Sequence, residues 1–177
     1  MALSFVVLLL SPIFVFVLPP FIAEGLYFSP ENWYVFVSGA SYLMYSVGFL
    51  FLLLSLFVLF LLNMRKISFF ISLVCVFLAG LSFYVAAQNY TSLGYDSIAY
   101  REIFLKEERI YPWSEVERAV YIEVPDQESP PEYEFYFTDG EKLTVIENDT
   151  IFLLGSFIRA SLDNVGTRIE IVRGYRD

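Results

Sequence analysis

Three long apolar runs without a charged side chain, all in the first half of the chain, constrain the fold more than any other feature. They cover residues 3–23, 34–62 and 67–88. At about 1.5 Å per residue, each run is long enough to cross the roughly 30 Å hydrocarbon core of a bilayer as a helix. The sequence therefore predicts a transmembrane region over residues 1–89 with three helical spans, and the lipid bilayer as its surroundings.

The first run admits two interpretations. Pro12, Pro19 and Pro20 are expected to kink a helix there, which membrane helices tolerate when neighbours satisfy the freed carbonyls. A cleaved signal peptide with its cut after Ala23 is the alternative. We favour a retained span, because no basic residue precedes the apolar stretch and the stretch is long for a signal peptide.

Short polar breaks separate the runs. Residues 25–33 contain a Ser-Pro turn signal, and Trp33 and Tyr34 suit the aromatic belt at the membrane interface. The break at Arg65 and Lys66 is so short that the second and third runs are expected to form a tight antiparallel hairpin. Small residues allow close helix packing, either within the chain or against another membrane protein. They are Ser38, Gly39, Ala40, Ser41, Ser46, Gly48, Ser72, Ala79, Gly80 and Ser82.

Arg65 and Lys66 also bear on the orientation in the membrane, because cationic residues next to a span favour the cytoplasm. The competing cations, Arg101 and Lys106, lie more than a dozen residues beyond the third run. We therefore expect the N-terminus inside and the C-terminal domain outside the cytoplasm. The reverse orientation follows if the distant pair decides.

Charge and residue types exclude several functions. The net charge of −9 arises entirely after Asn89, and such an acidic domain is a poor ligand for nucleic acid or anionic lipid headgroups. We expect neutral or basic partners. The chain has no histidine and a single cysteine, Cys75, which argues against imidazole or thiolate metal sites and histidine-based catalysis. We expect no cofactor, and no ion pathway through spans that lack ionisable groups.

From Tyr95 the pattern changes to short alternating segments with turn residues between them. Residues 96–105 and 107–113 are predicted as two strands or one bent hairpin, and residues 118–124, 132–139 and 142–147 as clearer strands. A helix capped by Asp149 or Thr150 is predicted over 150–165, and a last short strand over 168–175. The fold class is three transmembrane helices plus a small α+β domain, residues 95–177, with five or six antiparallel strands. A linker of about six residues joins the two parts.

A turn motif precedes the third of these strands and consists of Tyr111, Pro112, Trp113, Ser114 and Glu115. Pro112 presets a turn, Ser114 is expected to cap one helical turn over residues 115–118, and Trp113 supplies apolar area to the core. We favour this structural role over contact with a ligand.

The segments YPWSEVERAVYIEV (111–124) and TDGEKLTVI (138–146), followed by a helix, resemble the pleckstrin-homology-like (PH-like) domains that bacteria attach to transmembrane hairpins. In those proteins a Trp, a Ser, an acidic and an aliphatic residue open a short turn, matched here by residues 113–116. The resemblance covers residues 95–165. It implies antiparallel strands closed by one C-terminal helix.

Two sets of side chains are candidate sites. Tyr121, Tyr133 and Tyr136 put aromatic groups on both faces of a strand pair, which offers a partner-binding surface unless the helix and the membrane cover both faces. Glu134 is placed on the solvent face. The carboxylates Glu107, Glu108, Glu115, Glu117, Glu123, Asp126 and Glu128 follow no known metal-loop spacing, and we interpret them as a solvated surface.

These observations favour a multi-pass bacterial membrane protein that is not an enzyme. Its acidic domain is expected to bind or regulate a membrane or envelope protein close to the bilayer. Two alternatives remain open. One is an envelope enzyme or enzyme subunit that uses Glu107, Glu108 and Glu115, and the other is an accessory subunit of a transporter or channel.

Overall fold

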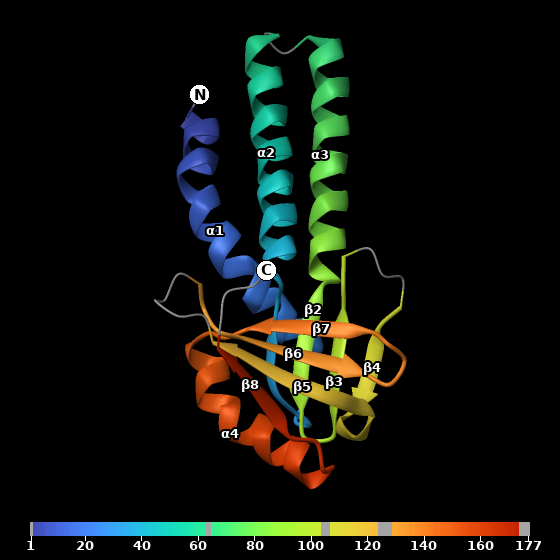
Figure 1. Ribbon diagram of the computed structural model, residues 1–177. Coiled ribbons are helices and arrows are strands. Elements are labelled where there is room, and N and C mark those ends of the chain that lie inside the picture. The colour runs from blue at the N-terminus through green and yellow to red at the C-terminus, as the bar shows by residue number, and fades with distance from the viewer. Residues whose placement is uncertain (1, 63–64, 104–106, 124–128, 174–177) are drawn as a thin grey trace. The chain divides into compact units, whose positions relative to one another are not determined.

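The computed structural model describes residues 2–62, 65–103, 107–123 and 129–173. Its helices are α1 (Ala2–Tyr27), α2 (Gly39–Leu61), α3 (Lys66–Ala87) and α4 (Asp149–Asn164) (Figure 1). Its strands are β1 (Asn32–Phe36), β2 (Tyr90–Gly94), β3 (Ser97–Arg101), β4 (Arg109–Pro112), β5 (Val116–Glu123), β6 (Glu132–Phe137), β7 (Lys142–Ile146) and β8 (Ile169–Arg173).

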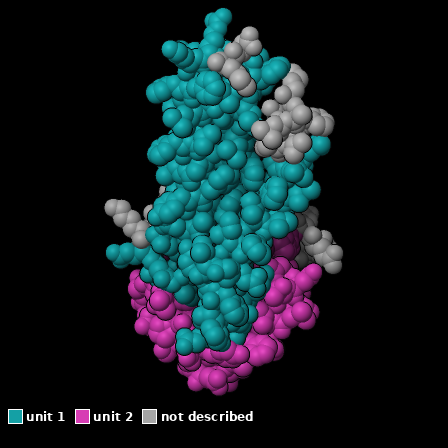
Figure 2. Space-filling view, turned by 180° about the vertical axis from the view of Figure 1, so that it is seen from behind, with its two compact units in different colours: residues 1–94, 99–109 teal, residues 95–98, 110–177 magenta. Residues whose placement is uncertain are grey.

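The chain divides into two compact units, coloured separately in Figure 2. Unit 1 comprises residues 1–94 and 99–109, and unit 2 comprises residues 95–98 and 110–177. The strands form two four-stranded sheets, with the orders β1-β2-β3-β4 and β7-β6-β5-β8. The prediction of three long apolar helices with an α+β remainder is confirmed at this level.

Helices α1, α2 and α3 are each long and apolar enough to cross a membrane. The second helix begins at Gly39 rather than at residue 34, because residues 32–36 form β1. Strand β1 pairs antiparallel with β2, with Val35 opposite Ser92. The predicted linker was therefore wrong, since residues 90–94 belong to a strand. This pairing brings the end of α1, the start of α2 and the end of α3 together within unit 1.

Small residues pack α2 against α3. On α2, the buried positions Ser41, Gly48 and Ser55 recur every seven residues, which is the spacing of an antiparallel helix seam. Ser55 and Ser72 share a buried hydrogen bond of 2.6 Å between their hydroxyls. A Cβ on Gly48 would lie 2.4 Å from the ring of Phe83, so a larger residue would require that ring to move. These residues serve packing within the chain, the first of the two predicted roles.

Other small residues lie outside this seam. A Cβ on Gly39 or Gly80 would meet nothing within 4 Å, and the Ser46 hydroxyl donates to the Tyr42 carbonyl of its own helix. Their small size therefore has no packing purpose within the described residues.

Helix α1 is built into unit 1. Ala23 is buried together with Val35 and Tyr90, and the Tyr27 ring stacks on Tyr90 with 3.8 Å between ring centroids. The Tyr27 hydroxyl also donates to the Ala87 carbonyl oxygen at 3.1 Å. Ala23, after which the signal-peptide alternative places the cut, is therefore part of the packing of unit 1.

The sheet of unit 2 is mixed. Strand β6 pairs antiparallel with β5 and β7, but β8 pairs parallel with β5, so the expectation of an all-antiparallel sheet was wrong. The reason is the connection: α4 lies between β7 and β8 and carries the chain across the sheet, so that β8 runs in the direction of β5. Figure 1 shows α4 against one face of this sheet.

Helix α4 begins one residue earlier than predicted. The cap is Asn148, whose side-chain oxygen accepts from the Ile151 backbone N–H at 2.9 Å, rather than Asp149 or Thr150. Gly166, with φ at +83°, follows the helix end as expected. Ile151, Ile158 and Leu162 are fully buried and form the inward face.

Candidate binding groove

The Trp113 motif is part of the core of unit 2. Trp113 lies in a one-turn 3-10 helix (Trp113–Glu115) and packs edge-on against Phe135, with 6.0 Å between ring centroids. Tyr111 stacks on Phe137 at 3.9 Å and donates its hydroxyl to Asp139 at 2.5 Å. The expected Ser114 cap was wrong: the turn begins at Trp113, directly after Pro112, and no side chain caps it.

The three candidate tyrosines lie on opposite faces of the sheet. Tyr121 and Tyr133 are directly opposite each other on β5 and β6, and their rings are 4.8 Å apart on the α4 face. Tyr136 is displaced by an odd number of residues and therefore points to the other face, opposite Arg118. The three tyrosines therefore do not form one surface: Tyr121 and Tyr133 share the α4 face, and Tyr136 lies on the opposite face.

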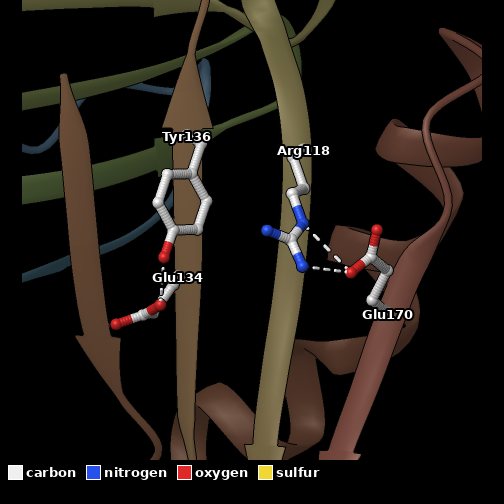
Figure 3. A network of polar contacts seen from close by, with 4 residues as sticks. All are labelled: Arg118, Glu134, Tyr136 and Glu170. Carbon is white, nitrogen blue, oxygen red and sulfur yellow. Dashed lines mark hydrogen bonds and ion pairs between the residues drawn. The ribbon is translucent and has the colours of Figure 1, made fainter. Parts of the chain in front are cut away.

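Tyr136 belongs to the polar network in Figure 3. Its hydroxyl donates to Glu134 at 2.6 Å, and Lys142 donates to the same carboxylate at 2.8 Å. The cations of Arg118 and Lys142 lie 5.7 and 5.8 Å from the Tyr136 ring centroid, and Arg118 pairs with Glu170 at 2.5 Å. The hydrogen bond to Glu134 raises the pKa of Tyr136.

Glu134 is only 5% exposed, so its predicted place on a solvent face was wrong. Strand β6 is an inner strand with β5 and β7 on its two sides, and Val120 and Thr144 flank Glu134 there. A carboxylate in this setting requires donors, and Tyr136 and Lys142 supply two of them.

A groove of about 520 Å³ opens on the α4 face. The sheet contributes Tyr121, Tyr133, Ile169 and Ile171, and the helix contributes Phe152, Gly155, Ser156, Arg159 and Asp163. Glu147 and Arg168 complete its lining. We call this site the α4–β8 groove.

Gly155 makes room for the base of the α4–β8 groove. A Cβ at this position would lie 3.2 Å from the Tyr133 hydroxyl oxygen, tighter than an ordinary contact. Glycine in a helix interior costs about 1 kcal/mol relative to alanine, so a glycine here is explained by the close approach of the tyrosine. A lone glycine within the predicted helix was the one sequence signal for this feature.

The two tyrosines in the groove are amphipathic and stay neutral at physiological pH. Burial, followed by a hydrogen bond to Glu147, raises the pKa of Tyr121. Burial also raises the pKa of Tyr133. Each ring therefore offers an apolar surface with a hydroxyl at its tip, the combination that is enriched at protein interfaces.

Large apolar side chains stand exposed at the rim. Phe152 is 68% and Ile171 is 60% exposed, and both line the groove. Strand β8 is the outermost strand of its sheet. An exposed edge strand beside an apolar patch is a template for pairing with another chain.

The candidate catalytic carboxylates do not lie in this groove. Glu107, Glu108 and Glu115 are exposed, and the Tyr90 hydroxyl donates to Glu108. Asp126 and Glu128 lie outside the described residues. Among the residues described, no three acidic, histidine or cysteine side chains gather closely enough to hold a metal ion, and Cys75 is buried in α3.

No protein-family model matches this sequence, and no curated protein matches it. The functional argument therefore rests on the geometry of the α4–β8 groove.

Proposed function

We propose that this chain is a multi-pass membrane protein of bacterial type whose non-catalytic C-terminal domain binds a segment of another membrane or envelope protein. The α4–β8 groove carries the proposal, because it combines one buried and one half-buried tyrosine, an exposed apolar rim and a strand that is outermost in its sheet among the described residues. A soluble surface rarely collects these three features unless a partner covers them.

The connection between α3 and unit 2 supports recognition of a partner close to the bilayer. Helix α3 ends at Ala87, and unit 2 comprises residues 95–98 and 110–177, so a short length of chain separates the proposed membrane-spanning helix from the binding domain. Restriction to the membrane surface raises the effective concentration for a partner in the same membrane. The partner can therefore be held by a groove of modest affinity.

The resemblance of residues 95–165 to PH-like domains belongs to this proposal. The order of β5, β6, β7 and α4 supports it, and Trp113 occupies the buried turn at which the matching motif stands. Strand β8 continues beyond the helix and supplies one wall of the groove.

Affinity purification of the intact protein in mild detergent is expected to recover a stoichiometric companion. Phe152→Asp should reduce its recovery at least about tenfold, because it places a charge on the apolar rim, and an acidic residue in the first turn of α4 leaves the helix stable. Ile110→Asp is the matched control, since Ile110 is 60% exposed and lies outside the groove. Recovery of the protein alone, or equal loss in both variants, would contradict the proposal.

We further propose that the C-terminal domain lies outside the cytoplasm. Arg65 caps and Lys66 begins α3, so both cations adjoin the turn between two spans, where their effect on orientation is greatest. A phosphatase fused after Asp177, active only outside the cytoplasm, is expected to show full activity. Activity of a cytoplasmic reporter at the same position would establish the reverse orientation.

A further inference from the structure

Two arginines in the α4–β8 groove differ from the other cations of unit 2. In the described part of this unit, Arg118 pairs with Glu170, Lys142 with Glu134, and Arg173 with Glu123. The remaining basic side chains, Arg159 and Arg168, both line the groove. Neither forms an ion pair with a described carboxylate.

The absence of an ion pair at Arg159 and Arg168 is informative, because the domain is rich in acidic side chains. A cation on such a surface has many possible partners, and three of the five described cations of unit 2 form an ion pair. Arg159 comes from α4 and Arg168 from the segment just before β8, so two separate elements bring unpaired guanidinium groups to one groove. Guanidinium groups recognise carboxylates through two parallel hydrogen bonds.

The acids of the groove form no ion pair with its arginines within the described residues. Glu147, which directly follows β7, is one acid in the lining. Asp163 is the other acid in the lining. The groove thus holds two arginines and two carboxylates that no ion pair joins among the described residues, whereas the rest of the domain is strongly acidic.

We propose that the α4–β8 groove, if it is the partner site inferred above, binds an extended segment that carries a carboxylate. The segment adds a strand to the free edge of β8, sets an apolar side chain against Phe152 and Ile171, and places an aspartate or glutamate between Arg159 and Arg168. This refines the expectation of neutral or basic partners: the net charge governs long-range attraction, and the groove selects a single anionic group.

A protein segment fits these features better than a lipid headgroup does. A headgroup would use the arginines alone and leave the strand edge and the apolar rim uncovered. The acidic domain also repels an anionic bilayer surface. A peptide satisfies the backbone edge, the rim and the cations together.

The test uses the full-length protein in phosphatidylcholine nanodiscs and three end-capped, fluorescent ten-residue peptides of alternating valine and threonine. The three peptides differ only at one central position, which is glutamate in the first, glutamine in the second and lysine in the third. Fluorescence anisotropy is expected to show the glutamate peptide binding roughly tenfold more tightly than the glutamine peptide, as charge-assisted hydrogen bonds imply, and more tightly than the lysine peptide. Arg159→Gln with Arg168→Gln should abolish this preference, and Arg118→Gln should preserve it.

Equal binding of the glutamate and glutamine peptides, no binding of either, or a preference that survives in the double variant would overturn the inference. If companion recovery still depends on Phe152 in that case, the groove is a partner site without carboxylate selection, and the proposed function stands. Displacement of the glutamate peptide by phosphatidylglycerol in the nanodisc would also overturn it and identify a lipid headgroup as the ligand.

Discussion

Replacing Trp113 with alanine is expected to lower the free energy of unfolding of the C-terminal domain by about 3–5 kcal/mol. Trp113 is 3% exposed and packs edge-on against Phe135, which is fully buried at the centre of β6. Truncation removes a large apolar side chain and leaves a cavity beneath the turn between β4 and β5. Thermal unfolding of the full-length protein in detergent, followed by circular dichroism, measures the loss.

Ser114→Ala is the matched control for Trp113. The two residues are adjacent in the same turn, but Ser114 is exposed and makes no capping hydrogen bond, so its substitution should change stability by less than about 0.5 kcal/mol. A loss of 1 kcal/mol or less in the Trp113 variant would show that the indole does not support the core. The ligand-contact role would then be the better explanation of the motif.

The three long apolar helices were predictable, because length and apolarity alone define them. Strand β1 was not, since Trp33 and Tyr34 are typical both of a membrane interface and of a strand. Its assignment depends on β2, nearly sixty residues later, and pairing over that separation leaves no local signal. The same ambiguity made residues 90–94 resemble a linker.

The groove was predictable only in part. Alternation along β5 and β6 indicated Tyr121 and Tyr133, because side chains on neighbouring strands face each other in a regular pattern. Arg159 and Arg168 were not found, since their meeting depends on α4 crossing the sheet and on β8 returning parallel to β5. The crossing of α4 and the parallel pairing of β8 depend on the topology of the whole sheet, which a local sequence pattern does not indicate.

Glu134 shows a second limit. Alternation correctly places it on the face opposite Phe135, but periodicity alone does not say whether that face is covered. In the structure it is buried, with Lys142 and Tyr136 as hydrogen-bond donors. The error therefore concerns burial rather than orientation, and it has a measurable consequence.

Lys142→Met is expected to destabilise the domain by about 2–3 kcal/mol, because it removes the ammonium group and leaves the carboxylate of Glu134 buried. The pair is 2.8 Å apart, with 7% of the glutamate and 38% of the lysine side chain exposed. The lysine's exposure places the effect below that of a fully buried pair. Urea unfolding of the full-length protein in detergent measures it.

Two further variants distinguish the cost of leaving the Glu134 charge buried without a partner from the cost of losing an ion pair in general. Glu134→Leu combined with Lys142→Met removes both charges and should recover stability to within about 1 kcal/mol of the parent, since paired apolar replacements are often neutral. Arg118→Met breaks an ion pair on the same face whose side chains are both 53% exposed, and it should cost clearly less than Lys142→Met. If Lys142→Met costs no more than Arg118→Met, Glu134 is in effect solvated, and the prediction of a solvent face would be restored.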